Sequence, residues 1–105
     1  MKNKFVWPGN ASCAVTLTYD DGLKSQLDNA LPVLNECGIK GTFFLSGAAL
    51  QEPACFPRWK EVVNAGHEIG IHTIHHACDL KHEFVRKGFG LQDYSIARMK
   101  EELTM

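Results

Sequence analysis

Short apolar segments alternate along this sequence with segments of helical periodicity. Residues 13–19 (CAVTLTY) and 41–45 (GTFFL) have the β-branched or aromatic composition of strands, and residues 67–71 (HEIGI) form a third, weaker candidate. Turn residues and a helical pattern follow in each case. Alternating strands and helices indicate an α/β fold with a parallel sheet. The sequence therefore predicts an α/β domain with about three strand–helix units.

Leucine spacing predicts the first helix, over about residues 23–36. Leu27, Leu31 and Leu34 recur at steps of four and three, which places them on one helix face. Pro32 lies within this stripe and lacks the N–H group that a helix interior needs. We therefore expect the helix to be kinked there or to start later.

Two further helices are predicted in the second half of the chain. A loop with two prolines leads into a helix over about residues 58–65, which Gly66 ends. Residues 77–92 are polar and contain glycine, so we expect a loop. The last helix begins near Asp93 or Ser95, either of which fits an N-cap. Its apolar face consists of Ile96, Met99 and Leu103.

Composition narrows the class of protein. The 105 residues suffice for one domain, and 45% apolar with 22% charged residues is typical of globular chains. Eleven basic and twelve acidic residues leave no basic excess for nucleic acid or an anionic membrane surface. No apolar stretch is long enough for a membrane span or a signal peptide. We expect no nucleic-acid or membrane partner and, unless an upstream segment is missing, a cytoplasmic location.

The four cysteines, at positions 13, 37, 55 and 78, form no CxxC pair, so a cysteine zinc site is not indicated. Disulfides would require an oxidising compartment. Cys13 and Cys37 lie in apolar patterns, and we expect both to be reduced and buried.

The two edges of the predicted sheet are unpaired. Three parallel strands leave two unpaired edges, and the last helix reaches Met105 without a stop signal. We expect a chain truncated at its C-terminus, residues 1–105 being part of a larger domain, and self-association of this chain in isolation.

Two polar clusters follow predicted strands, where active sites of parallel sheets gather. They are residues 18–22 (TYDDG) and residues 72–76 (HTIHH); taken alone, the first is also a turn sequence and the second a solvated cluster. His72 and His76, four residues apart, would share one face of a helical turn and can bind a metal together with one aspartate. The other aspartate is then free to act as a general base. This set is typical of metal-assisted hydrolysis.

These motifs resemble the polysaccharide deacetylase family (NodB homology domain, carbohydrate esterase family 4). Residues 18–22 match its first motif, and residues 72–76 match its second, H-S/T-x-x-H. Residues 41–45 look like the strand between them. Order and spacing agree over roughly residues 5–80, which corresponds to the N-terminal part of the family's domain.

The resemblance implies a role for each matching residue. Asp20 would be the catalytic base, and Asp21 would be a metal ligand with His72 and His76. Thr73 would fix the histidine loop by hydrogen bonding. The cofactor would be a divalent metal, zinc first, with Co²⁺, Ni²⁺ and Mn²⁺ as alternatives.

The family removes acetyl groups from N-acetylglucosamine units of chitin-like polymers or peptidoglycan, or from O-acetylated xylan, through a metal-activated water. Its fold is a distorted (β/α) barrel. The resemblance thus implies a hydrolase of acetylated carbohydrate, of which this chain would supply the first three βα units. The family's later motifs, with an arginine, a proline-aromatic stretch and a histidine acid, are not found, so we expect this chain alone to be inactive or nearly so.

Three other functions stay open. Cyclic amide hydrolases of the same fold, such as allantoinases, need the same activated water. A phospho-receiver domain also has paired acids after its first strand, but it needs an aspartate where this chain has residues 71–73 (IHT). The third is metal binding without catalysis. Of the remaining histidines, we expect His75 to be exposed and His67 to make a structural hydrogen bond.

Overall fold

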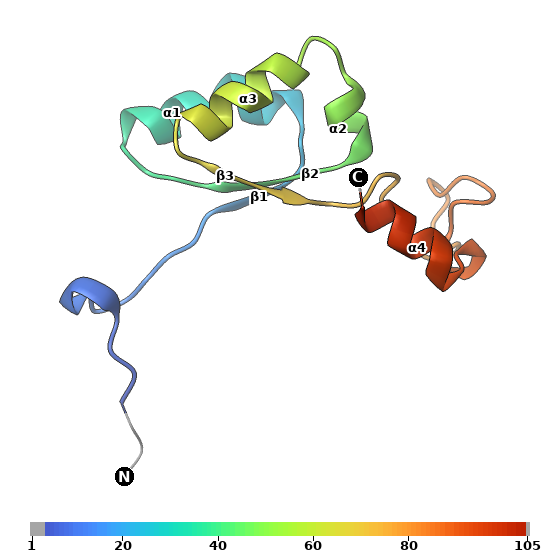
Figure 1. Cartoon of the computed structure of the whole chain (residues 1–105), viewed down its shortest axis with the longest axis horizontal. Helices are drawn as coiled ribbons and strands as arrows, with labels where there is room; N and C mark the ends of the chain where they lie inside the picture. Colours follow the sequence, from blue (N-terminus) through green and yellow to red (C-terminus); the bar gives the residue numbers. More distant parts are fainter. Residues whose placement is uncertain (1–3, 105) are drawn as a thin grey trace.

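The computed structural model describes residues 4–104, in which a three-stranded sheet carries helices on one face (Figure 1). The strands are β1 (Thr18–Asp21), β2 (Thr42–Leu45) and β3 (Glu68–Ile71), in the order β1-β2-β3. Both pairings are parallel. The prediction of an α/β fold with a parallel sheet is confirmed.

The two crossovers between strands lie on the same side of the sheet. Helices α1 (Leu31–Glu36), α2 (Gly47–Gln51) and α3 (Phe56–Asn64) cover one face, and sequential strands are neighbours (Figure 1). A doubly wound sheet instead reverses its strand order and carries helices on both faces. The observed winding is compatible with consecutive units of a (β/α) barrel. The barrel itself stays a prediction, because the sheet of residues 4–104 is open.

Strand β1 is shorter than expected. It begins at Thr18, whereas the composition predicted a strand from Cys13. The N–H of Thr42 donates to the carbonyl of Leu17 at 2.9 Å, and pairing with β2 starts only there. Since β1 is an edge strand, residues 13–16 have no second neighbour to pair with. Strand composition alone could not reveal where the partner begins.

The first helix passes through Pro32 by means of a wide turn. A π-helical turn, η2 (Gln26–Ala30), precedes α1, and the N–H of Leu31 donates to the carbonyl of Gln26, five residues back. Because Pro32 lacks an N–H group, a regular helix would leave a carbonyl without a donor at this point. The irregularity predicted from Pro32 is confirmed, as a π turn just ahead of it.

Helix α2 is not among the helices that the sequence predicts. Five residues are too few for a periodic pattern, and Ala49 of this helix packs in the core. Helix α3 begins at Phe56, two residues before the expected start. Pro57 occupies its first turn, where a missing N–H costs nothing.

The core lies between β2 and the three helices. Phe43 and Leu45 of β2 and Trp59 of α3 are almost completely buried, and the rings of Phe43 and Trp59 lie 5.7 Å apart. The remaining buried apolar residues are Leu27, Leu34, Ala49, Cys55 and Val62. Cys13 and Cys37 are exposed, so their predicted burial is wrong; Cys37 caps the end of α1 instead of facing the core.

The two ends of the described chain extend away from the sheet (Figure 1). The radius of gyration is 17.6 Å, whereas a compact chain of this length has about 13 Å. Helix α4 (Ile96–Leu103) follows Ser95, whose hydroxyl accepts the N–H of Arg98, which confirms Ser95 as the N-cap. Ile96 is 81% exposed, and α4 instead buries Glu102. No helix in residues 4–104 has the length and apolar character that crossing a bilayer requires.

Candidate metal centre

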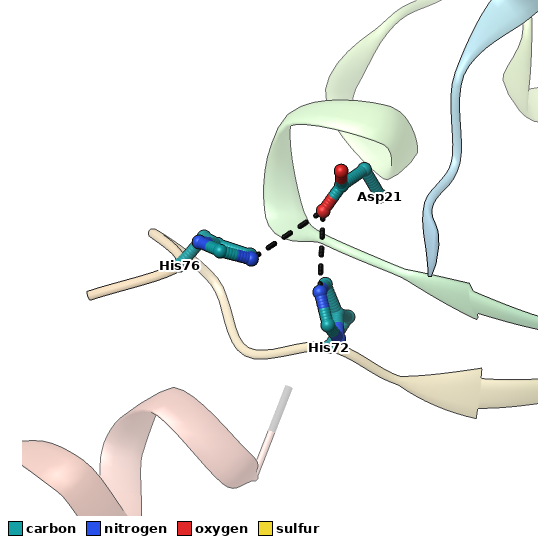
Figure 2. Close-up of side chains that lie close together, drawn as sticks. All are labelled: Asp21, His72 and His76. Atoms are coloured by element: carbon teal, nitrogen blue, oxygen red, sulfur yellow. Dashed lines mark ion pairs between the residues drawn. The ribbon is translucent and has the colours of Figure 1, made fainter. Parts of the chain in front are cut away.

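Three side chains from the carboxyl ends of β1 and β3 converge (Figure 2). Oδ1 of Asp21 lies 3.2 Å from Nε2 of His72 and 3.5 Å from Nε2 of His76. All three ligand atoms lie within 4.8 Å of one another. The structure thus brings Asp21 together with two histidines that lie about fifty positions later in the sequence.

The end of β1 bends sharply at Asp21. This residue has φ 76° and Gly22 has φ 68°, both in the left-handed region that glycine tolerates best. A Cβ atom on Gly22 would lie 2.5 Å from Cβ of Ala49 and 2.9 Å from Cδ2 of Leu45. The Asp-Asp-Gly sequence is therefore a tight bend against helix α2, and only glycine fits at its third position.

The histidine loop, residues 72–76, is not helical. Its first N–H, on His72, donates to the carbonyl of Leu45 and extends the β2–β3 pairing, after which Thr73 and His76 adopt φ 59° and 51°. The predicted helical turn is wrong, because left-handed residues interrupt it. The histidines meet through this bend, and the hydroxyl of Thr73 accepts the N–H of His76 at 3.0 Å.

Backbone strain is concentrated at this centre. In residues 4–104, four non-glycine residues have positive φ, and three of them are Asp21, Thr73 and His76. Such conformations cost about 1–3 kcal/mol each and persist where the surrounding structure enforces them, often at functional sites. Two of these residues, Asp21 and His76, are candidate ligands. The third, Thr73, accepts the N–H of His76 with its hydroxyl.

The end of β2 supports both halves of the centre, which the sequence did not indicate. The hydroxyl of Ser46 donates to the carbonyl of Asp21 at 3.3 Å. The N–H of Gly47 donates to the carbonyls of Thr73 and Ile74, each at 3.1 Å. A Cβ atom on Gly47 would lie 2.7 Å from the carbonyl oxygen of Ile74, so glycine permits this close approach. In the sequence, the only sign of this support is the Ser-Gly pair that follows the second strand.

Asp20 lies beside the centre without joining it. It is an exposed residue of β1, and its main-chain carbonyl accepts the Gln26 side-chain amide at 2.6 Å. Its carboxylate is not among the clustered atoms found in residues 4–104. Adjacent strand residues alternate in direction, which separates the two aspartates.

The two histidines that follow Ile74 have different partners. Nδ1 of His76 lies 3.5 Å from the sulfur of Cys78, which leaves Nε2 facing Asp21. His75 has a 41% exposed side chain and Nδ1 2.7 Å from the carboxylate of Glu102. Burial raises the pKa of Glu102, but hydrogen bonds from His75 and Tyr94 outweigh it and lower the pKa to about 2. Nothing in the local sequence pointed to this pair.

His67 makes the structural hydrogen bonds that were expected. Its Nδ1 accepts the N–H of Gly41 at 3.0 Å, so Nε2 carries the proton and faces the side-chain oxygen of Asn35 at 2.8 Å. Burial, and then the charge of Lys40, lowers the pKa of His67. This histidine ties β2 to helix α1 in its neutral form.

Two hollows flank the centre and offer room for a ligand. One, of about 410 Å³, is mostly apolar and borders Asp21 and Glu52. The other, of about 330 Å³, is more polar and borders His76 and Arg86. Pockets of about 300–1,000 Å³ are typical of small-molecule sites.

The donor set fits a divalent transition metal. Zinc binds imidazole nitrogen and carboxylate oxygen at about 2.0–2.2 Å, so neighbouring ligand atoms lie about 3–3.5 Å apart. Oδ1 of Asp21 has this spacing to both histidine nitrogens. Two histidines and one carboxylate on one side leave further positions for water or substrate.

Comparison with known proteins identifies the family of this chain. The profile of the family "Polysaccharide deacetylase" matches residues 10–104. A gellan lyase of Bacillus sp is 28% identical over 71 residues, covering 68% of this chain and 3% of its own length. "Putative polysaccharide deacetylase YxkH" of Bacillus subtilis (strain 168) is 34% identical over 64 residues, covering 59% of this chain and 23% of its own. The chain thus spans less than a quarter of either relative, and it belongs to the polysaccharide deacetylase family.

Proposed function

We propose that this chain is part of a metal-dependent hydrolase that removes acetyl groups from N- or O-acetylated carbohydrate. One observation carries the proposal: the convergence of Asp21, His72 and His76 within 4.8 Å. Membership of the polysaccharide deacetylase family supports the substrate class. The hollows beside the centre provide space for a sugar unit.

Each residue of the site has a proposed role. Asp21, His72 and His76 hold a divalent cation, zinc first, and Thr73 fixes the histidine loop through its bond to the His76 N–H. The bound cation supplies Lewis acidity toward water and the acetyl carbonyl. Asp20, outside the ligand cluster, is the base that takes the proton of the attacking water.

We also propose that the remaining catalytic groups lie outside these 105 residues. The family's later motifs, with an oxyanion donor and an acid for the leaving group, have no match here. Loss of one oxyanion donor lowers the rate about 10²–10³-fold. The chain alone should therefore release acetate slowly or not at all, and a distorted barrel would complete the site.

Metal stoichiometry tests the proposal directly. Chelator-stripped protein reloaded with zinc should bind about one ion per chain, and His72→Ala and Asp21→Ala should each abolish binding. His82→Ala, which removes a histidine from an exposed loop, is the matched control and should bind normally. Zinc binding that survives loss of His72 or Asp21 would contradict the proposal.

The reaction is distinguished by its product. Zinc-loaded chain, alone and within a longer protein, is incubated with N-acetylglucosamine oligomers and, separately, with allantoin. Acetate release by the longer protein supports deacetylation, and ring opening of allantoin would instead support a cyclic amide hydrolase. Zinc binding with neither product would leave metal binding as the function.

A further inference from the structure

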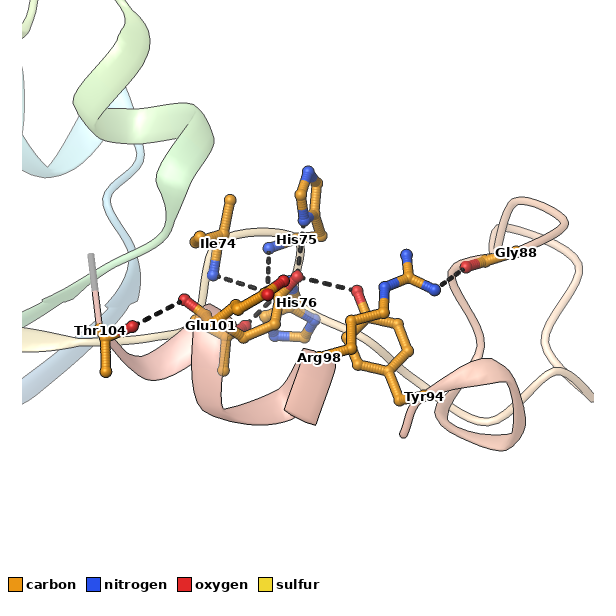
Figure 3. Close-up of polar contacts among 10 residues, drawn as sticks. Ile74, His75, His76, Gly88, Tyr94, Arg98, Glu101 and Thr104 are labelled. Carbon is orange, nitrogen blue, oxygen red and sulfur yellow. Dashed lines mark hydrogen bonds and ion pairs between the residues drawn. The ribbon is translucent and has the colours of Figure 1, made fainter. Parts of the chain in front are cut away.

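A buried carboxylate on helix α4 contacts the histidine loop, of which Figure 3 labels Ile74, His75 and His76. Glu102 is only 3% exposed, although glutamate is charged. Its Oε2 accepts the N–H of Ile74 at 2.9 Å and the N–H of His75 at 2.8 Å. One oxygen thus binds two consecutive peptide groups in the middle of the loop.

The second oxygen of this carboxylate is also fully used. Oε1 of Glu102 lies 2.7 Å from Nδ1 of His75 and accepts the hydroxyl of Tyr94 at 3.0 Å. An ionised carboxylate has about four acceptor positions, so these four donors satisfy it. Complete satisfaction is what allows a charged group to remain buried. A side chain so fully bonded holds its partners in one arrangement.

The histidine loop needs such support. Thr73 and His76 have left-handed backbone conformations, which persist only where the surroundings enforce them. From one side, the N–H of Gly47 binds carbonyls of the loop. From the other side, Glu102 binds N–H groups of the loop. The two supports act on opposite ends of the same peptide units, so neither replaces the other.

We infer that Glu102 is a positioning residue of the metal centre: through the peptide groups of Ile74 and His75, its carboxylate holds the histidine loop so that His72 and His76 face Asp21. The inference rests on the proposed function for the identity of the ion. Groups that orient metal ligands in this way typically change metal affinity 10–100-fold when removed.

Zinc affinity of four proteins tests the inference: the wild type, Glu102→Ala, Glu102→Gln and Glu101→Ala. Titration against a chromophoric chelator gives the affinity, and circular dichroism gives the folded fraction. Glu102→Ala should bind zinc about 10–100-fold more weakly. Glu102→Gln keeps an oxygen for the two N–H groups and should recover most of the affinity. Glu101, exposed on the same helix, is the control and should be replaceable without effect.

A folded Glu102→Ala chain with wild-type zinc affinity would overturn the inference. If this variant does not fold, Glu102→Asp decides, because it keeps the charge but withdraws the carboxylate by one methylene. Weaker zinc binding by a folded Glu102→Asp chain supports the inference, and unchanged binding overturns it.

Amide hydrogen exchange of the metal-free chain separates this inference from the proposed function. The amides of Ile74 and His75 should be protected in the wild type and in Glu102→Gln, and should exchange faster in Glu102→Ala. If the wild type bound no zinc, the proposed function would fail. Amide exchange would still report on the hydrogen bonds between Glu102 and the N–H groups of Ile74 and His75. Equal exchange in the wild type and Glu102→Ala would overturn the inference.

Discussion

Replacing Gly47 by alanine tests whether the end of β2 supports the metal centre. The added Cβ would lie 2.7 Å from the carbonyl oxygen of Ile74, whereas ordinary contact begins near 3.4 Å, so the histidine loop must withdraw by about 0.7 Å. Overpacking of this kind costs about 1–3 kcal/mol. The higher helix propensity of alanine returns at most about 1 kcal/mol. We expect a net loss of about 1–2 kcal/mol.

Thermal unfolding and zinc titration measure the two consequences of Gly47→Ala. One kcal/mol corresponds to about 4–8 °C in Tm for a domain of this size. Withdrawal of the loop also lengthens both hydrogen bonds from the Gly47 N–H, which are 3.1 Å long. Since these bonds position the loop that carries two ligands, zinc affinity should fall about ten-fold.

Gly38→Ala is the matched control for Gly47→Ala. Gly38 has φ 66° and no atom within 4 Å of its added Cβ, so alanine there costs backbone strain without touching the loop. We expect a comparable fall in Tm with unchanged zinc affinity. Wild-type zinc affinity in folded Gly47→Ala, or equal loss in both variants, would refute the reasoning.

Three further predictions concern acid, the base and the core. Because the pKa of Glu102 is held at about 2 instead of its ordinary 4.5, its stabilisation is complete above pH 4.5 and disappears as the pH falls toward 2. The full contribution of Glu102 to the free energy of unfolding is about 3 kcal/mol. Between pH 7 and pH 2.5, denaturant unfolding should show a larger loss of stability in the wild type than in Glu102→Gln. Equal losses of stability would contradict this assignment of the pKa. Asp20→Asn should bind zinc with wild-type stoichiometry in the metal assay, since its carboxylate lies outside the ligand cluster; loss of zinc would make Asp20 a ligand. Phe43→Ala should destabilise the chain by about 3–5 kcal/mol in denaturant unfolding, because the ring is completely buried, and a change below 1 kcal/mol would show that the core is not where the structure has it.

Local patterns predicted the elements whose cause is local. Strands β2 and β3 and the Ser95 cap follow from composition and capping chemistry, and the structure has them at the expected places. The meeting of Asp21 with the histidines followed from the rule that parallel strands end at one edge of a sheet. Their individual roles remain proposals.

Features that depend on distant partners escaped the sequence. Strand β1 starts where β2 starts, and helix α2 exists because Ala49 packs on the core. The bend of the histidine loop depends on Gly47 and Glu102, which lie 25 or more residues away from its centre. Hydrophobic periodicity cannot encode contacts of this separation, which is why the loop was expected to be helical.

The middle strand of the sheet contributes no ligand, yet it sets the span of the metal centre. Strands β1 and β3 are each one neighbour away from β2, so their axes are separated by about 9–10 Å. A short aspartate and two longer imidazoles must reach across this gap, over the end of β2. The separation of β1 and β3 thus sets the distance that the side chains of Asp21 and the two histidines must span. A change that moves the end of β2 should therefore alter the distance between Asp21 and the two histidines.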